Sequence, residues 1–304
     1  MPHIVVVGSI NMDLVIRTAK IPMPGETVLG KDLQTIPGGK GANQAVALAR
    51  LGAQVTLIGK VGEDTFGSEL VANLEREGID ITHVRMQAGV ASGIALITLD
   101  ESGQNSIVVA SGANMHLMPE EVVEAWEYIQ DVDGLVVQLE IPLETVQTAV
   151  RLGKDYGARV ILNPAPAPAA PLSSSFYEAV DILTPNESEA KSLTCLSDLE
   201  SAAQRMLDWG VKRVVITRGA SGVLVARRGR PMENLPAFEV ETVDTVAAGD
   251  AFTGGLGVAL AEGMAMEEAI PFAQAAAALS VTRRGAQPSL PTTQEVHQFL
   301  SERT

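Results

Sequence analysis

The fold is decided by the stretch HIVVVGSINMD (residues 3–13), in which a short, β-branched apolar run ends at a glycine and polar residues follow. Residues 4–7 fit a buried strand of a parallel sheet, because such strands are apolar on both faces. Similar runs recur along the chain and are interspersed with segments rich in Ala, Leu and Glu. The runs are 55–58, 135–139, 160–162, 182–183 and 214–217, and the expected helices are 42–51, 66–77, 120–129, 143–156, 199–209, 248–262, 267–282 and 293–302. This alternation predicts a three-layer α/β/α fold whose middle layer is a mainly parallel sheet.

Two segments break the alternation. Residues 14–36 and 91–110 contain strand-like runs, among them TVLGKDLQTI and GIALITL, with no helix between them. They predict a small β-sheet beside the main one, which could close over a site as a lid or could only add edge strands. No low-complexity linker, repeat or block of charge divides the chain, so we expect residues 1–304 to form a single domain that carries this sheet.

The composition excludes several classes of protein. The chain has 304 residues, of which 46% are hydrophobic, so it can bury a large core. It has 37 acidic and 22 basic residues and a net charge of −15, which argues against general binding to nucleic acid or to anionic membranes. With Cys195 as the single cysteine, no signal-peptide pattern and no run of about 20 apolar residues, we expect a soluble, cytoplasmic protein.

Common nucleotide and metal motifs are absent from the sequence. Gly41 follows Lys40 where a P-loop would need Ser or Thr, and no G-x-G-x-x-G follows the first strand. The four histidines lack the spacing of a zinc site.

Two polar segments lie near the amino terminus. GSINMD (residues 8–13) follows the first strand, and its Asn11 and Asp13 could bind vicinal hydroxyls or could form an ordinary turn. PGGKGANQ (residues 37–44) opens a helix, where glycines allow close backbone approach and Lys40 and Asn43 add donors. A plain glycine-rich loop is the alternative.

Two more segments lie in the second half. In ILTPNESEA (residues 182–190), Asn186 and Glu189 are spaced either for one face of a ligand site or for the cap of a helix. In VDTVAAGDAFTGGL (residues 243–256), a strand-like segment ends at 244–245, and small residues then leave the N–H groups at a helix start bare. A carboxylate at that start, Asp250, suits proton removal from a hydroxyl that attacks a phosphate, although a tightly packed helix cap is the alternative.

Together these segments closely resemble the ribokinase branch of the PfkB family of carbohydrate and purine kinases. GGKGANQ matches the family's first signature and DTVAAGDAF its second, and the similarity continues to RRGAQPS near the end of the chain. The resemblance implies a ribokinase-like α/β domain whose lid is formed by about 14–36 and 91–110.

The resemblance also implies roles for individual residues. The general base would be Asp250, acting on the 5-hydroxyl, and Ala247, Ala248 and Gly249 would complete the anion hole. The sugar would be bound by Asn11, Asp13, Gly39, Lys40, Asn43 and Glu140. The nucleotide would contact Asn186, Thr217, Arg218, Gly219, Ala220, Ser221, Gly222, Gly249 and Gln274, although Arg218 and Gln274 depart from the residues usual in relatives. Glu189 would hold Mg²⁺ through water, and a monovalent cation such as K⁺ would bind Asp244, Val246, Ser280, Arg283, Gly285 and Ser289.

The activity that the resemblance implies is ATP-dependent phosphorylation of ribose at the 5-hydroxyl, activated by K⁺, in a homodimer joined through the lid. The alternatives are a related kinase for deoxyribose, fructose or a nucleoside, and a non-catalytic sugar-binding regulator. An intact Asp250 beside an anion hole disfavours the regulator, since a binding protein needs no base there.

Overall fold

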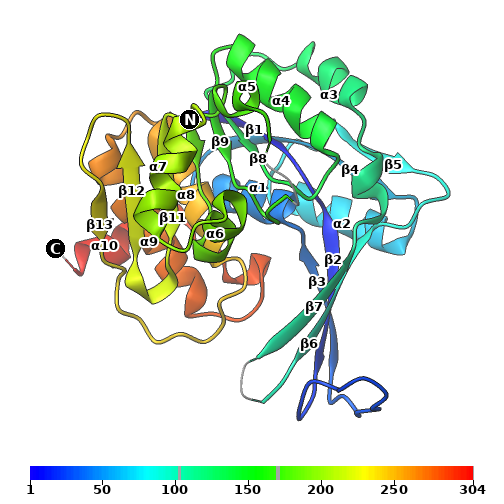
Figure 1. The fold of residues 1–304 in the computed structure, drawn as a ribbon. Coiled ribbons are helices and arrows are strands. Elements are labelled where there is room, and N and C mark those ends of the chain that lie inside the picture. Colours follow the sequence, from blue (N-terminus) through cyan, green and yellow to red (C-terminus); the bar gives the residue numbers. More distant parts are fainter. Residues whose placement is uncertain (102–103, 169–171, 304) are drawn as a thin grey trace.

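A nine-stranded sheet forms the centre of the protein. The computed structural model describes residues 1–101, 104–168 and 172–303. Within them the strand order is β13-β12-β11-β10-β9-β8-β1-β4-β5, and every neighbouring pair from β11 to β5 is parallel (Figure 1). The strands are β1 (His3–Val7), β4 (Gln54–Gly62), β5 (Val84–Gln87), β8 (Gly134–Val137), β9 (Arg159–Leu162), β10 (Ile182–Leu183), β11 (Arg213–Thr217), β12 (Val223–Arg227) and β13 (Glu233–Leu235).

Helices cover both faces of this sheet. The apolar core on one face includes residues of α1 (Lys40–Arg50), α2 (Thr65–Arg76), α8 (Ala248–Ala261), α9 (Met266–Val281) and α10 (Thr293–Ser301). The core on the other face includes residues of α3 (Pro119–Trp126), α4 (Leu143–Asp155), α5 (Ser174–Tyr177), α6 (Glu187–Thr194) and α7 (Leu199–Asp208). Side chains alternate along each strand, so Val5 and Val7 face one core while Ile4 and Val6 face the other. The predicted three-layer α/β/α class is confirmed.

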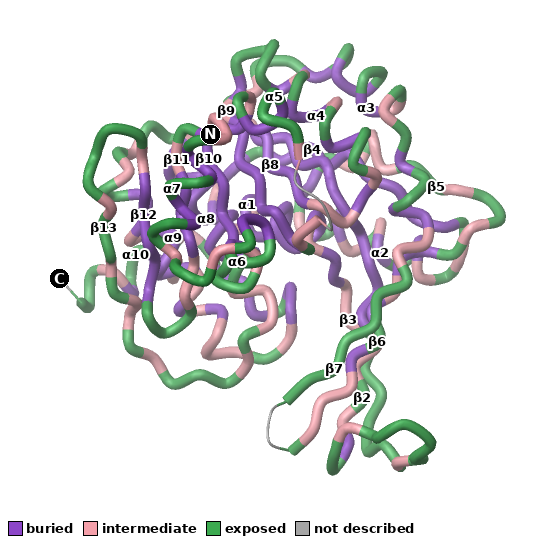
Figure 2. The backbone as a smooth tube through the Cα atoms, viewed as in Figure 1, coloured by how far each residue is buried: buried purple, intermediate pink, exposed green. Residues whose placement is uncertain are grey.

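A four-stranded sheet projects from this body in the order β3-β2-β6-β7 (Figure 1). Its strands are β2 (Asn11–Arg17), β3 (Leu33–Gly38), β6 (Gly93–Leu99) and β7 (Asn105–Ala110), so the two segments that break the helical alternation pair with each other through the parallel contact of β2 and β6. Residues 102–103, between β6 and β7, lie outside the described residues. All of β7 is exposed, whereas the central strands of the main sheet, such as β8, are buried (Figure 2).

Several predicted elements are wrong in detail. Residues 27–32 contain no strand, and the segment leading to 244–245 is irregular and not strand-like. The helix predicted over 120–129 ends at Trp126, and the strand predicted to reach 139 ends at Val137. The sequence analysis also missed β5, α5 and the antiparallel edge strands β12 and β13, whereas α6 was foreseen only as the helix that Asn186 could cap. The short helices and edge strands carry too little periodic signal to stand out.

Candidate active site

The predicted motifs adjoin at the carboxyl edge of the main sheet. β1 ends at Val7, and the chain then passes beside the starts of α1 and α8. Gly39, the residue before α1, has a φ of 88°, and a Cβ there would lie 2.6 Å from the backbone nitrogen of Asn11. A glycine is therefore required for α1 to begin against the GSINMD segment.

Asp250 lies in the first turn of α8 and is only 6% exposed. Its Oδ2 accepts a hydrogen bond of 3.0 Å from Asn43 Nδ2, and its Oδ1 accepts one of 2.9 Å from Gln44 Nε2. Burial raises the pKa of Asp250, and the charge of Lys40 together with the two amide donors offsets part of that rise. The carboxylate is thus oriented by two donors and retains lone pairs that can accept a proton.

Further polar side chains converge near Asp250. Asp13 is 8% exposed, and burial, with Glu140 and Asp250 nearby, raises its pKa to about 7. Among the described residues, no group donates a hydrogen bond to the Asp13 carboxylate. Glu140 accepts hydrogen bonds from Ser9 Oγ and from the backbone nitrogen of Lys40. For the Lys40 side chain, burial lowers the pKa but the carboxylates of Asp250, Glu140 and Glu189 raise it by more.

The start of α8 presents bare N–H groups. Ala247 has a left-handed backbone (φ 61°), and the N–H groups of Ala248 and Ala251 donate to Thr245 and Ala247. Within the part of the chain that the structure describes, the N–H groups of Gly249 and Asp250 have no acceptor. A Cβ at Gly249 would meet no atom within 4 Å, so this residue faces open space. Two free donors at the positive end of a helix form an anion-binding site.

Two cavities meet at this helix start. A polar cavity of about 180 Å³ is lined by Lys40, Asn186, Glu189, Gly249 and Asp250, among others. A more apolar cavity of about 380 Å³ lies next to it and includes Phe238, Val240, Phe252 and Val281. They share Thr217, Thr245, Ala248 and Gly249. The arrangement suits a ligand with one flat apolar part and one anionic part, the anion reaching the bare N–H groups.

A model of pfkB family carbohydrate kinases matches residues 1–293 of the chain. The chain belongs to this family. It is 46% identical over 300 residues to the ribokinase of Haemophilus influenzae, with 97% of both chains covered. Its structure is similar to that of ribokinase from Thermotoga maritima (38% identity, TM-score 0.90, 99% and 100% of the chains covered). It also resembles Arabidopsis thaliana ribokinase complexed with ribose and ATP (32% identity, TM-score 0.88, 98% of both chains covered). The family predicted from the two signatures is confirmed.

The residues expected at the nucleotide of a pfkB kinase are only partly gathered at the apolar cavity. Thr217, Gly219, Ala220, Gly222 and Gln274 are among its lining residues. Arg218 and Ser221 are not among them, and the Arg218 guanidinium turns to the carbonyl oxygens of Ser221 and Val223.

Gln274 already uses its amide within the protein. Its Nε2 donates a 2.9 Å hydrogen bond to the carbonyl oxygen of Pro236 and so anchors the irregular loop that follows β13. The sequence reading missed that loop, residues 237–242, although most of it lines the cavity. No turn motif or apolar periodicity marks it.

Asn186 and Glu189 both cap a helix and line the polar cavity. Asn186 Oδ1 accepts from the backbone nitrogen of Glu189, and a Glu189 carboxylate oxygen accepts from that of Asn186, both at 2.8 Å, which makes a capping box for α6. Both residues also line the polar cavity. Burial raises the pKa of Glu189, and the backbone hydrogen bond and Lys40 oppose this rise. The capping interpretation of this motif therefore holds beside its place at the site.

The residues expected at a monovalent cation lie beside the start of α8. Asp244 accepts hydrogen bonds from the backbone nitrogens of Val246 and Gly285, each 3.0 Å long. Its own backbone nitrogen donates to Val281, one residue after Ser280. The side chain of Arg283 pairs with Glu295 at 2.6 Å, so Arg283 could contribute only its backbone oxygen. Ser289 Oγ donates to the carbonyl oxygen of Ala286 and keeps lone pairs that could bind a cation.

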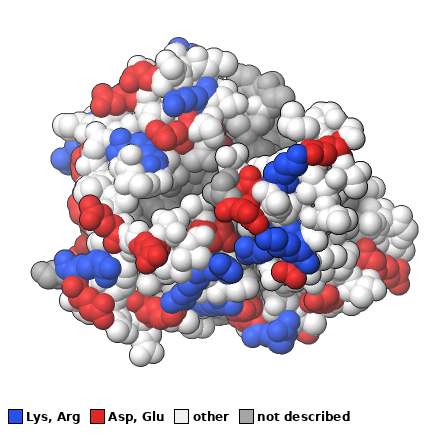
Figure 3. All heavy atoms as spheres, turned by 90° about the horizontal axis from the view of Figure 1, so that it is seen from below, with Lys and Arg blue, Asp and Glu red and all other residues white. Residues whose placement is uncertain are grey.

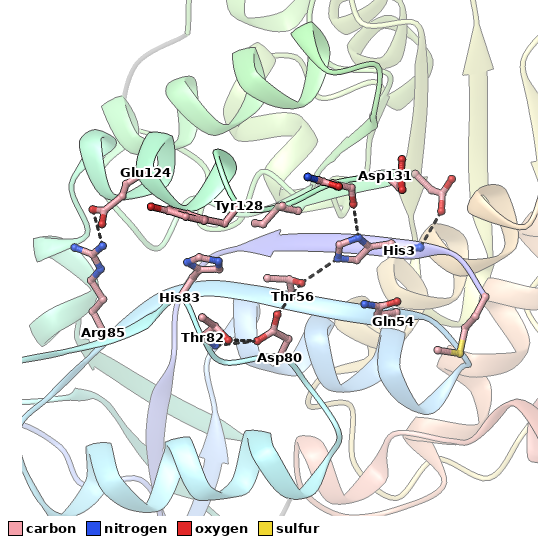
Figure 4. A pocket seen from close by; sticks show the side chains of 14 residues that line it. His3, Gln54, Thr56, Asp80, Thr82, His83, Arg85, Glu124, Tyr128 and Asp131 are labelled. Carbon is pink, nitrogen blue, oxygen red and sulfur yellow. Dashed lines mark hydrogen bonds and ion pairs between the residues drawn. The ribbon is translucent and has the colours of Figure 1, made fainter.

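A larger cavity, of about 910 Å³, lies at the opposite edge of the main sheet, where β1 and β4 begin (Figure 4). His3, Thr56, Asp80, His83 and Arg85 are among its lining residues, and none of the predicted site residues is. This cavity is the larger one, but the predicted residues and the bare N–H groups lie at the carboxyl edge, so we place the candidate site there.

On the face from which the small sheet projects, acidic and basic side chains are interspersed around a hollow (Figure 3). No helix among the described residues is long and apolar enough to cross a membrane.

Proposed function

We propose that this protein transfers the γ-phosphoryl group of ATP to the 5-hydroxyl of D-ribose. The observation that carries the proposal is the buried Asp250 carboxylate beside the bare N–H groups of Gly249 and Asp250, at the junction of the two cavities. A carboxylate beside an anion site is unfavourable for anion binding alone, and it is useful where a hydroxyl must lose a proton as it attacks a phosphate.

The sugar would lie between β2, α1 and the segment that follows β8. Its hydroxyls would meet the carboxylates of Asp13 and Glu140, the amides of Asn11 and Asn43, the backbone at Gly39, and Lys40. Two unsatisfied groups support this placement. The Asp13 carboxylate accepts no hydrogen bond among the described residues, and Asn43 Oδ1 is buried without a partner. Vicinal hydroxyls would supply the missing donors.

Asn11 is oriented for the same purpose. Asn114 Nδ2 donates to Asn11 Oδ1 at 2.7 Å, and Asn114 Oδ1 accepts from the backbone of Ile10 at 2.8 Å. Because Asn11 Oδ1 already accepts a hydrogen bond, the amide N–H groups of Asn11 would be the ones that donate to the oxygen of a sugar hydroxyl.

In the reaction, Asp250 takes the proton of the 5-hydroxyl as the oxygen attacks the γ-phosphorus. The bond between that phosphorus and the bridging oxygen breaks, and the electron pair leaves with ADP. Charge on the transferred group is stabilised by the N–H groups of Gly249 and Asp250, beside Ala247 and Ala248, and by Lys40. The adenine would occupy the apolar cavity, with Gly219, Ala220, Gly222 and Gln274 around it.

Two cations complete the proposal. Mg²⁺ would neutralise phosphate charge near Asn186 and Glu189, where a carboxylate lines the polar cavity. K⁺ would be held by oxygen atoms, which suit hard cations, from Asp244, Val246, Ser280, Arg283, Gly285 and Ser289, several of them through their backbone carbonyls. Because Asp244 already ties residues 244–246 to Gly285, a cation there would order the turn that precedes α8.

We further propose that the small sheet acts as the lid of the site and joins two copies into a homodimer. Leu96, Ile107, Val108 and Val109 on β6 and β7 are 46–63% exposed. An exposed apolar edge strand invites pairing, and a second copy of the same sheet would cover it.

The test is ATP turnover against a panel of ribose, deoxyribose, fructose and adenosine. Ribose should be the best substrate because residues 14–36 and 91–110 contain no Phe, Trp or Tyr to hold a nucleoside base. Asp250→Asn should lower turnover by about 10²–10⁴. A better rate with adenosine would refute the sugar assignment, and sugar binding without any turnover would favour the non-catalytic alternative.

A further inference from the structure

A chain of buried amides leads from the core to Asp250. Gln44 Nε2 donates to Asp250 Oδ1 at 2.9 Å and to Asn163 Oδ1 at 3.1 Å. Gln138 Nε2 donates to Gln44 Oε1 at 2.6 Å, and Asn163 Nδ2 donates to the carbonyl oxygen of Thr184 at 2.9 Å. These groups come from α1, from the segments after β8, β9 and β10, and from α8, so the chain joins five parts of the fold.

The direction of every amide in this chain is determined by its two ends. The Thr184 carbonyl can only accept, so Asn163 must turn its NH₂ toward it and its oxygen toward Gln44. An ionised Asp250 can also only accept, so both N–H groups of Gln44 are used and its oxygen must face Gln138. A flipped Gln44 would set its oxygen against the carboxylate of Asp250 and the oxygen of Asn163. The arrangement therefore matches the ionised form of Asp250.

Gln44 has no access to a substrate. Gln44 and Gln138 are both 0% exposed, whereas Asn43 is 6% exposed and has one unpartnered amide oxygen. The two neighbours could therefore have different roles. Asn43 could contact both Asp250 and a sugar, while Gln44 can act on a substrate only through Asp250.

We propose that Gln44 is a positioning residue, oriented by Gln138, that holds the Asp250 carboxylate in its ionised form and in the direction needed for proton removal. The expected change in reaction rate rests on the proposed function, whereas the expected change in the titration of Asp250 does not. Desolvation raises the pKa of Asp250, and the charge of Lys40 and the donors of Asn43 and Gln44 oppose the rise. The carboxylates of Asp13 and Glu189 also lie close enough to interact with its charge, and Gln44→Met leaves all of these groups in place except the Gln44 donor. Without that donor, Asp250 should bind its proton more tightly.

The experiment measures the titration of Asp250 directly, by ¹³C NMR of aspartate-labelled full-length protein, with the signal assigned from Asp250→Asn. In Gln44→Met, which keeps the length of the side chain without its donor, the midpoint should rise by roughly one to two pH units. Gln138→Met frees the amide of Gln44 to turn and should raise the midpoint by less. An unchanged midpoint in Gln44→Met would overturn the proposal.

The second readout is the pH profile of kcat/KM for ribose. On the acid limb of the profile, kcat/KM of Gln44→Met should be roughly 10- to 100-fold lower than that of the wild type. The difference should shrink at high pH, where Asp250 is ionised in both proteins. A ratio that stays the same at every pH would mean general damage to the fold and would also overturn the proposal.

Thr56→Val provides the matched control. Thr56 is 2% exposed, and its hydroxyl contacts His3 Nε2 at 3.0 Å and Asp80 at 3.4 Å, at the opposite edge of the sheet (Figure 4). It should change stability without moving the Asp250 midpoint. If the wild type does not phosphorylate ribose but Gln44→Met still raises the midpoint, the function is wrong and the positioning role stands. If Gln44→Met does not fold, the midpoint in Gln138→Met decides, and no shift there would refute the proposal.

Discussion

Asp13→Asn should stabilise the protein while it weakens sugar binding. The wild-type side chain is nearly buried, receives no hydrogen bond among the described residues, and lies near Glu140 and Asp250. Its pKa rises from 3.8 to about 7, chiefly through burial and then through the two carboxylates. Above neutral pH the folded protein therefore holds the negative charge of Asp13 in a buried place, whereas in the unfolded chain the same charge is hydrated.

The size of the effect follows from that shift. A rise from 3.8 to about 7 corresponds to about 4 kcal/mol of stability, as an upper limit because neighbouring carboxylates titrate with Asp13. Since the pKa is raised in the folded state, the contribution is fully present below pH 3.8 and is lost as the pH rises through about 7. Asparagine has the same shape and carries no charge. The variant should therefore exceed the wild type by up to about 4 kcal/mol at pH 8 and by only about 1 kcal/mol at pH 4.5.

Urea unfolding at the two pH values, without sugar, measures this difference. Asp32→Asn is the control, because Asp32 is an exposed aspartate just before β3 and its loss should change little at either pH. The same Asp13→Asn protein should raise the KM for ribose far more than that for ATP, because the carboxylate that pairs with hydroxyls is gone. A stability gain that is absent, or equal at both pH values, would refute the reasoning.

Four further outcomes are expected. The KM for ribose should rise as the pH falls below about 7, where Asp13 gains a proton, while a KM that is level from pH 6 to 8 would contradict this. Gly249→Ala should lower turnover by roughly 10²-fold with an unchanged Tm, because the added methyl meets no protein atom within 4 Å but fills the space beside the free N–H groups; a lower Tm would show that the space is not open. Replacing Na⁺ or Li⁺ with K⁺ at constant ionic strength should raise the rate, and equal rates in all three salts would count against the Asp244 site. Val108→Glu should convert a dimer to a monomer in sedimentation, and a monomeric wild type would exclude the dimer.

Local patterns predicted the elements with strong periodicity. Helices α1, α4, α7 and α8 begin and end within about two residues of the prediction. In α4 and α7 an apolar stripe marks the helix, whereas α8 is a continuous run of small and apolar residues. The capping box of Asn186 and Glu189 is a contact between residues three apart, and such contacts are visible in any sequence.

Contacts between segments that lie far apart in the sequence could not be predicted from local patterns. The loop at 237–242 lines the apolar cavity because Gln274 and the edge strands β12 and β13 hold it there. Nothing in its own composition marks it as part of a site. In the same way, GGKGANQ presents Gln44 as one more polar residue, and its role depends on Gln138, Asn163 and Asp250, which lie 94, 119 and 206 positions away.

The sequence by itself determined the family, the parallel α/β class and the set of polar residues near the strand ends. These follow from residue types in short windows, and two specific signatures in the right order suffice to recognise them. Only the tertiary structure decided which charges are buried, which amides point toward Asp250, and that the two small-sheet segments pair through β2 and β6. The physical reason is that desolvation and hydrogen-bond direction depend on neighbours brought together by packing, and packing is a property of the whole chain.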